Sequence, residues 1–236
     1  MPAPTDASSA RPYRGVRADE RLATRRSRFL TAGLDLLGAE QPDISALTVR
    51  GICREAGLAV RYYYESFTDK DEFIGAVFDS VITELAATTQ AAIRALPWRE
   101  RMRAGMANIV WAIDNDARVG RLLFSTQLAN SVIVRKRAES SALFALLSGQ
   151  YVGDALQMPA NDHIKAAAHF VVGGVGQTIS AWLAGDVKLK PDQLVDQLAS
   201  LLNDLADPKL ALPRVTEKGA AGADSPRDPA ATDASS

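Results

Sequence analysis

Arginine and tyrosine side chains cluster just after a glycine in the first third of this 236-residue chain. They are Arg61, Tyr62 and Tyr64, within the string AGLAVRYYYESF. A guanidinium group can donate two hydrogen bonds to O6 and N7 of guanine, which discriminates against other bases by about 1–3 kcal/mol. A tyrosine adds a hydroxyl group and an apolar ring. If these side chains project from one short helix, their chemistry suits contact with the bases and phosphates of DNA.

A short amphipathic helix is predicted immediately before this cluster. Thr48 can cap its first turn, because a threonine hydroxyl accepts hydrogen bonds from free backbone N–H groups. Gly57 can end it, because glycine tolerates positive φ. Between these two residues lies an apolar stripe at helical spacing, formed by Val49, Ile52, Cys53 and Ala56.

A second short helix is predicted from about Ala59. Tyr63 and Phe67 share one face at a spacing of four and are expected to be core, which leaves Arg61 and its aromatic neighbours on the other face. Two short helices joined by a glycine turn match the plan of a helix-turn-helix DNA-binding unit. A simple helical hairpin within a globular core is the alternative that this stretch alone leaves open.

Composition is that of an ordinary globular protein, with 47% hydrophobic and 23% charged residues. The net charge of −1 argues against a protein that coats nucleic acid without selectivity. The lone cysteine, Cys53, excludes an internal disulfide framework and favours a reducing compartment. No apolar run is long enough to span a membrane and no signal-peptide core is visible, so we expect a cytoplasmic protein without a membrane partner.

Positive charge is concentrated near the N-terminus, where residues 11–28 hold seven arginines against Asp19 and Glu20. We interpret residues 1–20 as a disordered basic arm that either reaches DNA or serves as a solubilising tail. The first helix is expected over residues 21–39. Three arginines at its ordered edge are expected to contact phosphates: Arg25, Arg26 and Arg28.

The remaining chain predicts helices throughout, so the fold class is all-α. We expect a three-helix DNA-binding domain over residues 21–68 and a larger helical domain over residues 69–207. Asp69 and Glu72 form a D-x-x-E capping pair at the start of a long fourth helix. From residue 208 to 236, Pro, Gly, Ala and Asp dominate and predict a disordered tail.

The final two long helices suit self-association. Residues 163–184 are apolar nearly all round, so this helix needs cover on every side, and its glycines permit close approach of another backbone. Two such helices from each of two chains would form a four-helix bundle, although packing within one chain is the alternative. The residues expected at a homodimer interface are Val175, Ile179, Trp182, Leu194, Leu198, Leu201 and Leu205.

Over roughly residues 25–79 the sequence resembles the TetR family of bacterial transcriptional regulators, and its string RYYYESF looks like a variant found in actinobacterial members. The resemblance rests on a threonine at the second helix start, the turn, an aromatic pair three apart and a lysine three further on. The matching residues are Thr48, Ile52, Ala56, Gly57, Leu58, Tyr64, Phe67, Lys70 and Phe73.

This resemblance implies an N-terminal DNA-binding domain and a C-terminal domain that binds a small ligand and dimerises. It implies that Arg61 and Tyr62 face base edges, while Tyr64 contacts the backbone. Ala59 departs from the usual serine cap, and Val60 offers only a contact to a thymine methyl group. The full set expected at double-stranded DNA is Arg25, Arg26, Arg28, Thr48, Val49, Arg50, Ala59, Val60, Arg61, Tyr62, Tyr64 and Lys70.

We therefore expect a dimeric regulator, most simply a repressor that a small, mostly hydrophobic effector releases from a palindromic operator. Aromatic and polar residues of the C-terminal helices are candidates for its pocket, although an aromatic residue or a histidine at such a position is more often part of the core. They are Trp111, Asn115, Phe124, Gln127, His169, Phe170 and Gln177. A DNA-binding regulator controlled by a protein partner is the alternative.

An all-helical enzyme is an alternative from another class, and the residues disfavour it. His163 and His169 are six apart and so lie on different faces of one helix, which argues against a joint metal site. Cys53 lies on a predicted buried stripe with no neighbouring base. We expect no catalytic residue, no metal site and no cofactor.

Overall fold

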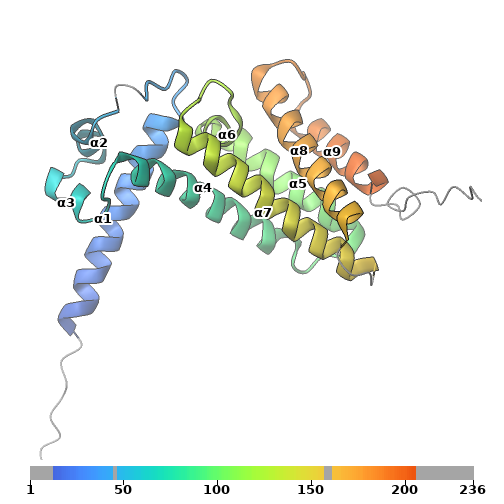
Figure 1. Ribbon diagram of the computed structural model, residues 1–236, viewed down its shortest axis with the longest axis horizontal. Coiled ribbons are helices and arrows are strands. Elements are labelled where there is room, and N and C mark those ends of the chain that lie inside the picture. Colours follow the sequence, from blue (N-terminus) through green and yellow to red (C-terminus); the bar gives the residue numbers. More distant parts are fainter. Residues whose placement is uncertain (1–12, 45–46, 157–160, 206–236) are drawn as a thin grey trace, which may run out of the picture.

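The computed structural model describes residues 13–44, 47–156 and 161–205, and every regular element in these ranges is a helix (Figure 1). This confirms the predicted all-α class. The helices are α1 (Tyr13–Leu37), α2 (Val49–Ala56), α3 (Val60–Tyr64), α4 (Lys70–Ile93), α5 (Trp98–Asn115), α6 (Ala117–Phe124), α7 (Ser131–Leu156), α8 (Asp162–Ala184) and α9 (Pro191–Leu205).

Local capping explains where α2, α3 and α4 begin and end. The hydroxyl oxygen of Thr48 accepts a hydrogen bond from the backbone N–H of Gly51 at 3.1 Å, and Gly57 closes α2 with φ of 62°. Ala59 precedes α3 without any side-chain cap, as its methyl group requires. Asp69 accepts from the Glu72 N–H, while Glu72 accepts from the Thr68 N–H. The predicted limits of α2 and the predicted starts of α3 and α4 are thus confirmed, whereas α3 ends at Tyr64 and does not include Phe67 as expected.

A cluster of four aromatic rings holds the N-terminal helices together. Phe29 of α1 packs edge-to-face against Tyr63 and Phe67, and Phe73 of α4 contacts both of these rings. Tyr63 is 0% exposed and donates its hydroxyl hydrogen to the backbone carbonyl of Asp69 at 3.0 Å. The expectation that Tyr63 and Phe67 are core is confirmed. The buried ring of Tyr63 therefore holds α3 against α1 and α4.

Helix α1 begins earlier than the sequence predicted. Residues 13–20 were expected within a disordered arm, but α1 starts at Tyr13 and its N-terminal half projects beyond α2 and α3 (Figure 1). Pro12 is the last helix-breaking residue in the sequence before this stretch, and Gly15 alone does not stop a helix. The expected arm over residues 1–12 and the expected tail from residue 208 lie outside the described residues.

Helix α4 runs from the helix-turn-helix unit to the C-terminal helices (Figure 1). A second apolar core joins α5, α8 and α9 around Val110, Ile113 and Val195. Three residues expected at a dimer interface belong to this core and not to a surface: Ile179, Leu194 and Leu198. That prediction is wrong for them, because α9 turns Leu194 and Leu198 towards α5 of its own chain and Ile179 of α8 packs into the same core.

Helix α6 ties the C-terminal helices to α1. Arg118 forms ion pairs with Asp35 of α1 and with Asp116, and its guanidinium lowers the pKa of the Asp116 carboxyl group. Arg121 donates to the carbonyl of Gly38 at 2.6 Å. Arg137 of α7 donates to the Leu122 carbonyl at 2.7 Å and so caps the end of α6. None of the helices in the described ranges is both long and apolar enough to cross a lipid bilayer.

Replacing Tyr63 with phenylalanine should lower the free energy of unfolding by about 1 kcal/mol, because the hydrogen bond to the Asp69 carbonyl is lost. Urea denaturation at neutral pH measures this change. Tyr64→Phe is the matched control, since Tyr64 is 62% exposed, and it should leave the stability unchanged. Equal effects of the two substitutions would contradict the anchoring role of Tyr63.

The same tyrosine should make the protein less stable in alkali. Burial raises the pKa of the Tyr63 phenol, so above pH of about 10 the unfolded chain ionises this group while the folded chain does not. The contribution of the buried, protonated Tyr63 phenol to the unfolding free energy is therefore fully present below that pH and is lost as pH rises above it. Tyr63→Phe should show the shallower alkaline decline in unfolding free energy.

Candidate nucleic-acid interface

The outer face of α2 and α3 carries a group of exposed cationic and aromatic side chains. Arg50 lies on α2, whereas Val60, Arg61 and Tyr64 lie on α3, and all four are exposed. Tyr63 points into the aromatic core, whereas Arg61 and Tyr64 lie at other angles around α3 and are exposed. We call this group of four residues the reader surface. Its guanidinium groups, phenol and methyl groups are the kinds of group that contact bases and phosphates.

Tyr62 is held between two arginines. The guanidinium carbon of Arg25 lies 4.2 Å from the ring centre of Tyr62, and that of Arg61 lies 4.5 Å from it. Arg61 also donates to the Tyr62 hydroxyl oxygen at 2.5 Å, and this hydrogen bond lowers the pKa of the Tyr62 phenol. Arg61 is exposed, but Tyr62 is half-buried and packs against the core. Tyr62 therefore positions Arg61 and is not a free reader of base edges.

The three arginines at the ordered edge of α1 all have partners within the chain, with Arg25 and Arg26 half-buried and Arg28 exposed. Arg25 forms an ion pair with Glu65 at 3.5 Å. Arg26 donates to the Ser66 carbonyl and stacks on the Phe67 ring, and Arg28 donates to the Ala56 carbonyl at 2.8 Å. These contacts stabilise the ends of α2 and α3, where helix carbonyls lack partners, and the phosphate contacts expected of the three arginines stay a prediction.

The remaining predicted residues lie around the reader surface. Thr48 is exposed at the start of α2 with its hydroxyl group in the cap. Val49 is half-buried and packs on the core. Ala59 is exposed at the turn, and Lys70 is half-buried at the first residue of α4.

The sequence prediction missed one exposed arginine next to the reader surface. Arg54 is exposed in the last turn of α2, one helical turn after Arg50. The sequence does predict this placement, because residues four apart lie on one side of a helix, and Arg50 and Arg54 both fall outside the apolar stripe of α2.

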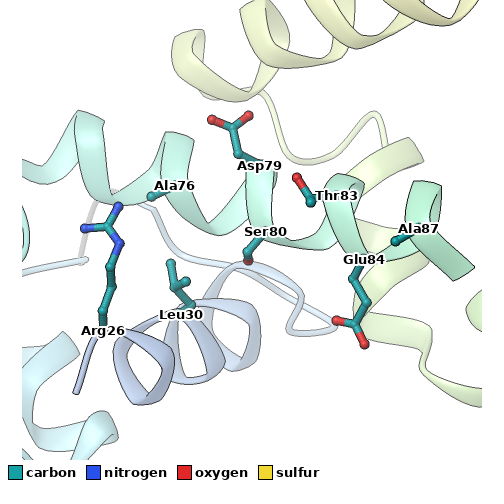
Figure 2. A pocket seen from close by; sticks show the side chains of 8 residues that line it. All are labelled: Arg26, Leu30, Ala76, Asp79, Ser80, Thr83, Glu84 and Ala87. Atoms are coloured by element: carbon teal, nitrogen blue, oxygen red, sulfur yellow. The ribbon is translucent and has the colours of Figure 1, made fainter. Parts of the chain in front are cut away.

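The predicted ligand-binding residues do not converge on a cavity. Six of them are exposed: Trp111, Asn115, Gln127, His169, Phe170 and Gln177. Phe124 is half-buried and packs against both cores. An open groove of about 520 Å³ lies instead between α1 and α4, and none of the seven lines it (Figure 2). Its lining includes Arg26 and Leu30 from α1 with Asp79 and Glu84 from α4.

Helix α8 leaves a large apolar surface open. Phe170 is 69% exposed, and apart from the adjacent residues and the backbone of α8 itself, no atom lies within 4 Å of where a side chain would start at Gly173, Gly174 or Gly176. Val175 and Trp182, expected at an interface, are half-buried against the second core. Leu201 and Leu205 of α9 are exposed, as the interface prediction requires. Phe170, assigned to a pocket from the sequence, belongs to this surface.

Solved structures with the same arrangement of helices are transcriptional regulators. A TetR-like regulator from Rhodococcus sp. RHA1 has a TM-score of 0.58 and 19% identity, over 80% of this chain and 97% of its own. A TetR-family regulator from Streptomyces coelicolor has a TM-score of 0.60 and 18% identity, over 78% and 80%. FadR from Bacillus subtilis, solved in complex with stearoyl-CoA, has a TM-score of 0.62 and 16% identity, over 75% and 96%.

No protein-family model matches the chain. The structural similarity extends over both the helix-turn-helix unit and the C-terminal helices, since it covers three quarters or more of the chain. The fold that the sequence resemblance implied is confirmed on this basis. The chain has the fold of the TetR-like transcriptional regulators.

Proposed function

We propose that this protein is a dimeric, TetR-like transcriptional regulator that binds a two-fold symmetric DNA operator through the reader surface. The observation that carries the proposal is the exposed placement of Arg61 and Tyr64 on a short helix whose other side is locked into the aromatic core. Rigid support of this kind suits base recognition, because hydrogen bonds to base edges require the donor to be held in position.

Dimerisation is the second part of the proposal, and the open face of α8 supports it. The largely exposed Phe170 lies on α8 near three glycines that no other helix covers. Together they form an apolar surface that a second copy of α8 could cover. The exposed leucines of α9, Leu201 and Leu205, could join the same contact. A two-fold dimer presents two reader surfaces to half-sites separated by about one helical turn of DNA or a multiple of it.

Regulation by a small effector is the third part. Structural relatives supply support, since FadR from Bacillus subtilis was solved with stearoyl-CoA. An effector would act by favouring an arrangement in which the two readers no longer match the half-sites, which requires unequal affinity for the two arrangements. Two features connect the C-terminal helices to the reader surface and could transmit such a change: the continuous helix α4 and the contacts of α6 with α1. Repression released by the effector is the simplest outcome.

Control by a protein partner in place of a small molecule remains the competing form of this proposal. The exposed apolar residues of α7, such as Leu143 and Leu146, favour it. The catalytic alternative has no comparable support, because the structural relatives described above are transcriptional regulators.

Selection of bound fragments from a pool of genomic DNA by purified protein tests the central proposal. We expect a symmetric consensus sequence, and Arg61→Ala should then weaken binding to it by about 1–3 kcal/mol and relax one base position per half-site. Arg61→Lys separates the contribution of the positive charge from that of base recognition, because lysine retains the charge but not the paired hydrogen bonds. It should lose base preference and keep most non-specific affinity.

Arg94→Ala is the matched control, since Arg94 is an exposed arginine at the far end of α4. It should leave both affinity and consensus unchanged. An identical consensus for wild type and Arg61→Ala would remove Arg61 from base recognition, and the absence of any selected sequence would reject the proposed function.

The dimer is tested by Phe170→Asp, which places a charge in the open face of α8. Sedimentation equilibrium should show a dimer for wild type and a monomer for the variant, with operator affinity reduced at least about tenfold because two-site binding is lost. Val134→Asp is the matched control, because Val134 is an exposed apolar residue on α7. A dimer that survives Phe170→Asp would exclude this face as the interface.

The effector is tested with stearoyl-CoA as a first probe and coenzyme A as the control. If the acyl chain is recognised, saturating stearoyl-CoA should release the selected operator duplex, whereas coenzyme A alone should not. It should also raise the melting temperature, since a ligand at about 100 times its Kd stabilises the fold by about 2.7 kcal/mol. Operator binding that no acyl-CoA changes, together with an unchanged melting temperature, would favour control by another class of effector.

A further inference from the structure

Tyr62 of α3 lies where helix α1 meets the reader surface. The guanidinium carbon of Arg25 of α1 lies 4.2 Å from the ring centre of Tyr62, and that of Arg61 lies 4.5 Å from the same ring. Helical spacing does not explain the contact with Arg61, because consecutive side chains on a helix do not face each other. Arg61 therefore bends back over Tyr62, and the hydrogen bond from its Nη2 to the Tyr62 hydroxyl oxygen holds it there.

Tyr62 is itself held in place by its own neighbours. Its ring is half-buried and packs against the core. Arg25 is also half-buried, and it forms an ion pair with Glu65, the residue at the C-cap of α3, at 3.5 Å. The ring of Tyr62 therefore cannot turn towards solvent without losing its contacts with both the core and Arg25.

The guanidinium group of Arg61 keeps hydrogen-bond donors for DNA in this position. Its hydrogen bond to Tyr62 uses one N–H group of Nη2, whereas an arginine side chain carries five such groups and guanine O6 and N7 require only two. Glu65 offsets the charge of Arg25, with which it pairs, while Arg61 is exposed. The positive charge and the remaining donors of Arg61 are therefore available on the reader surface.

We propose that Arg25 of α1 is a positioning residue for base recognition: it holds the ring of Tyr62, and Tyr62 in turn orients the guanidinium group of Arg61 towards a guanine of each half-site. The inference rests on the proposed function, because it needs α3 to lie on the bases of a duplex. Paired hydrogen bonds to guanine require the plane of the guanidinium group to be aligned with the base. An arginine that its neighbours hold in one orientation therefore discriminates between bases better than a free one.

A positioning role for Arg25 makes a different prediction from a direct contact with phosphate. Phosphate contacts add affinity and salt dependence but carry no base preference. An Arg61 side chain that Tyr62 no longer holds would still attract phosphates, but it would also occupy rotamers that point away from the base edge. Loss of the contact between Arg25 and Tyr62 should therefore lower base preference and leave the salt dependence of binding almost unchanged.

The test uses the full chain and the operator duplex selected by the wild-type protein. Versions of this duplex carry each of the four bases at the position that Arg61→Ala relaxes, and the ratio of their Kd values measures base preference. Tyr62→Phe removes the hydroxyl group and keeps the ring, whereas Arg25→Gln removes the stacked guanidinium group. Tyr63→Phe is the matched control for loss of a phenol on α3, and Arg94→Gln is the matched control for loss of a charge.

We expect Tyr62→Phe to lower the preference for guanine by about two- to tenfold, which is the contribution typical of one hydrogen bond. Arg25→Gln should lower the preference by a similar factor. Neither variant should reduce the slope of log affinity against log salt by the value of about 0.9 that each lost phosphate contact removes. Arg25→Lys retains the charge for the ion pair with Glu65 and serves as a milder variant. It should also lower the preference, because lysine lacks the planar group that stacks on the ring.

A double-mutant cycle shows whether the two residues act through Arg61. In an Arg61→Ala background, Tyr62→Phe and Arg25→Gln should have no further effect on base preference, because the group that they position is absent. Tyr63→Phe should keep the wild-type base preference even though it lowers the free energy of unfolding. Arg94→Gln should keep the wild-type preference and slope.

The outcomes separate this inference from the proposed function. If wild-type protein selects a defined operator but Tyr62→Phe and the Arg25 variants keep its base preference, the positioning role is overturned and the regulator proposal stands. The same conclusion follows if Arg25→Gln lowers only the salt slope, since Arg25 would then be a phosphate contact. If wild-type protein selects no duplex, both proposals fail.

Two further results would also overturn the inference. An equal loss of preference in Tyr62→Phe and Tyr63→Phe would show that either substitution simply loosens α3. A preference for a base other than guanine at the position that Arg61→Ala relaxes would exclude guanine as the partner of Arg61.

Discussion

Edge-to-face packing of Phe29 against Tyr63 and Phe67 is the contact on which the remaining structure depends. Helix α3 has five residues, and a helix this short has no independent stability in water. Its conformation therefore comes from the rings beneath it and from the hydrogen bond between Tyr63 and the carbonyl of Asp69. Since the same hydrogen bond fixes the start of α4, the reader surface and the long connecting helix are positioned by one cluster of side chains.

Helix α1 supports this unit from two sides. Its apolar face supplies Phe29, and its arginines reach the carbonyls left free where α2 and α3 end. Near its C-terminal end, Asp35 and the carbonyl of Gly38 accept from arginines of α6. One helix thus contacts α2, α3 and α6.

Local sequence determined the helix-turn-helix unit almost completely. A hydroxyl group at Thr48, positive φ at Gly57 and the paired carboxylates of Asp69 and Glu72 each act within four residues of themselves, so their roles can be predicted from spacing. The burial of Tyr63 followed from its spacing to Phe67. The predicted fold class followed from the same kind of evidence, since every segment of the described C-terminal region has helical periodicity and no strand alternation.

Tertiary structure alone decided which partners the charged and apolar groups found. Arg26 and Arg28 bind carbonyls 40 and 28 residues away, and spacing cannot reveal a partner at that distance. An all-round apolar helix such as α8 does not show which side its own chain covers; packing on α7 and α5 buried Ile179 and left Phe170 exposed. Helical periodicity places a residue on a face, but the direction of that face depends on contacts between elements far apart in the sequence.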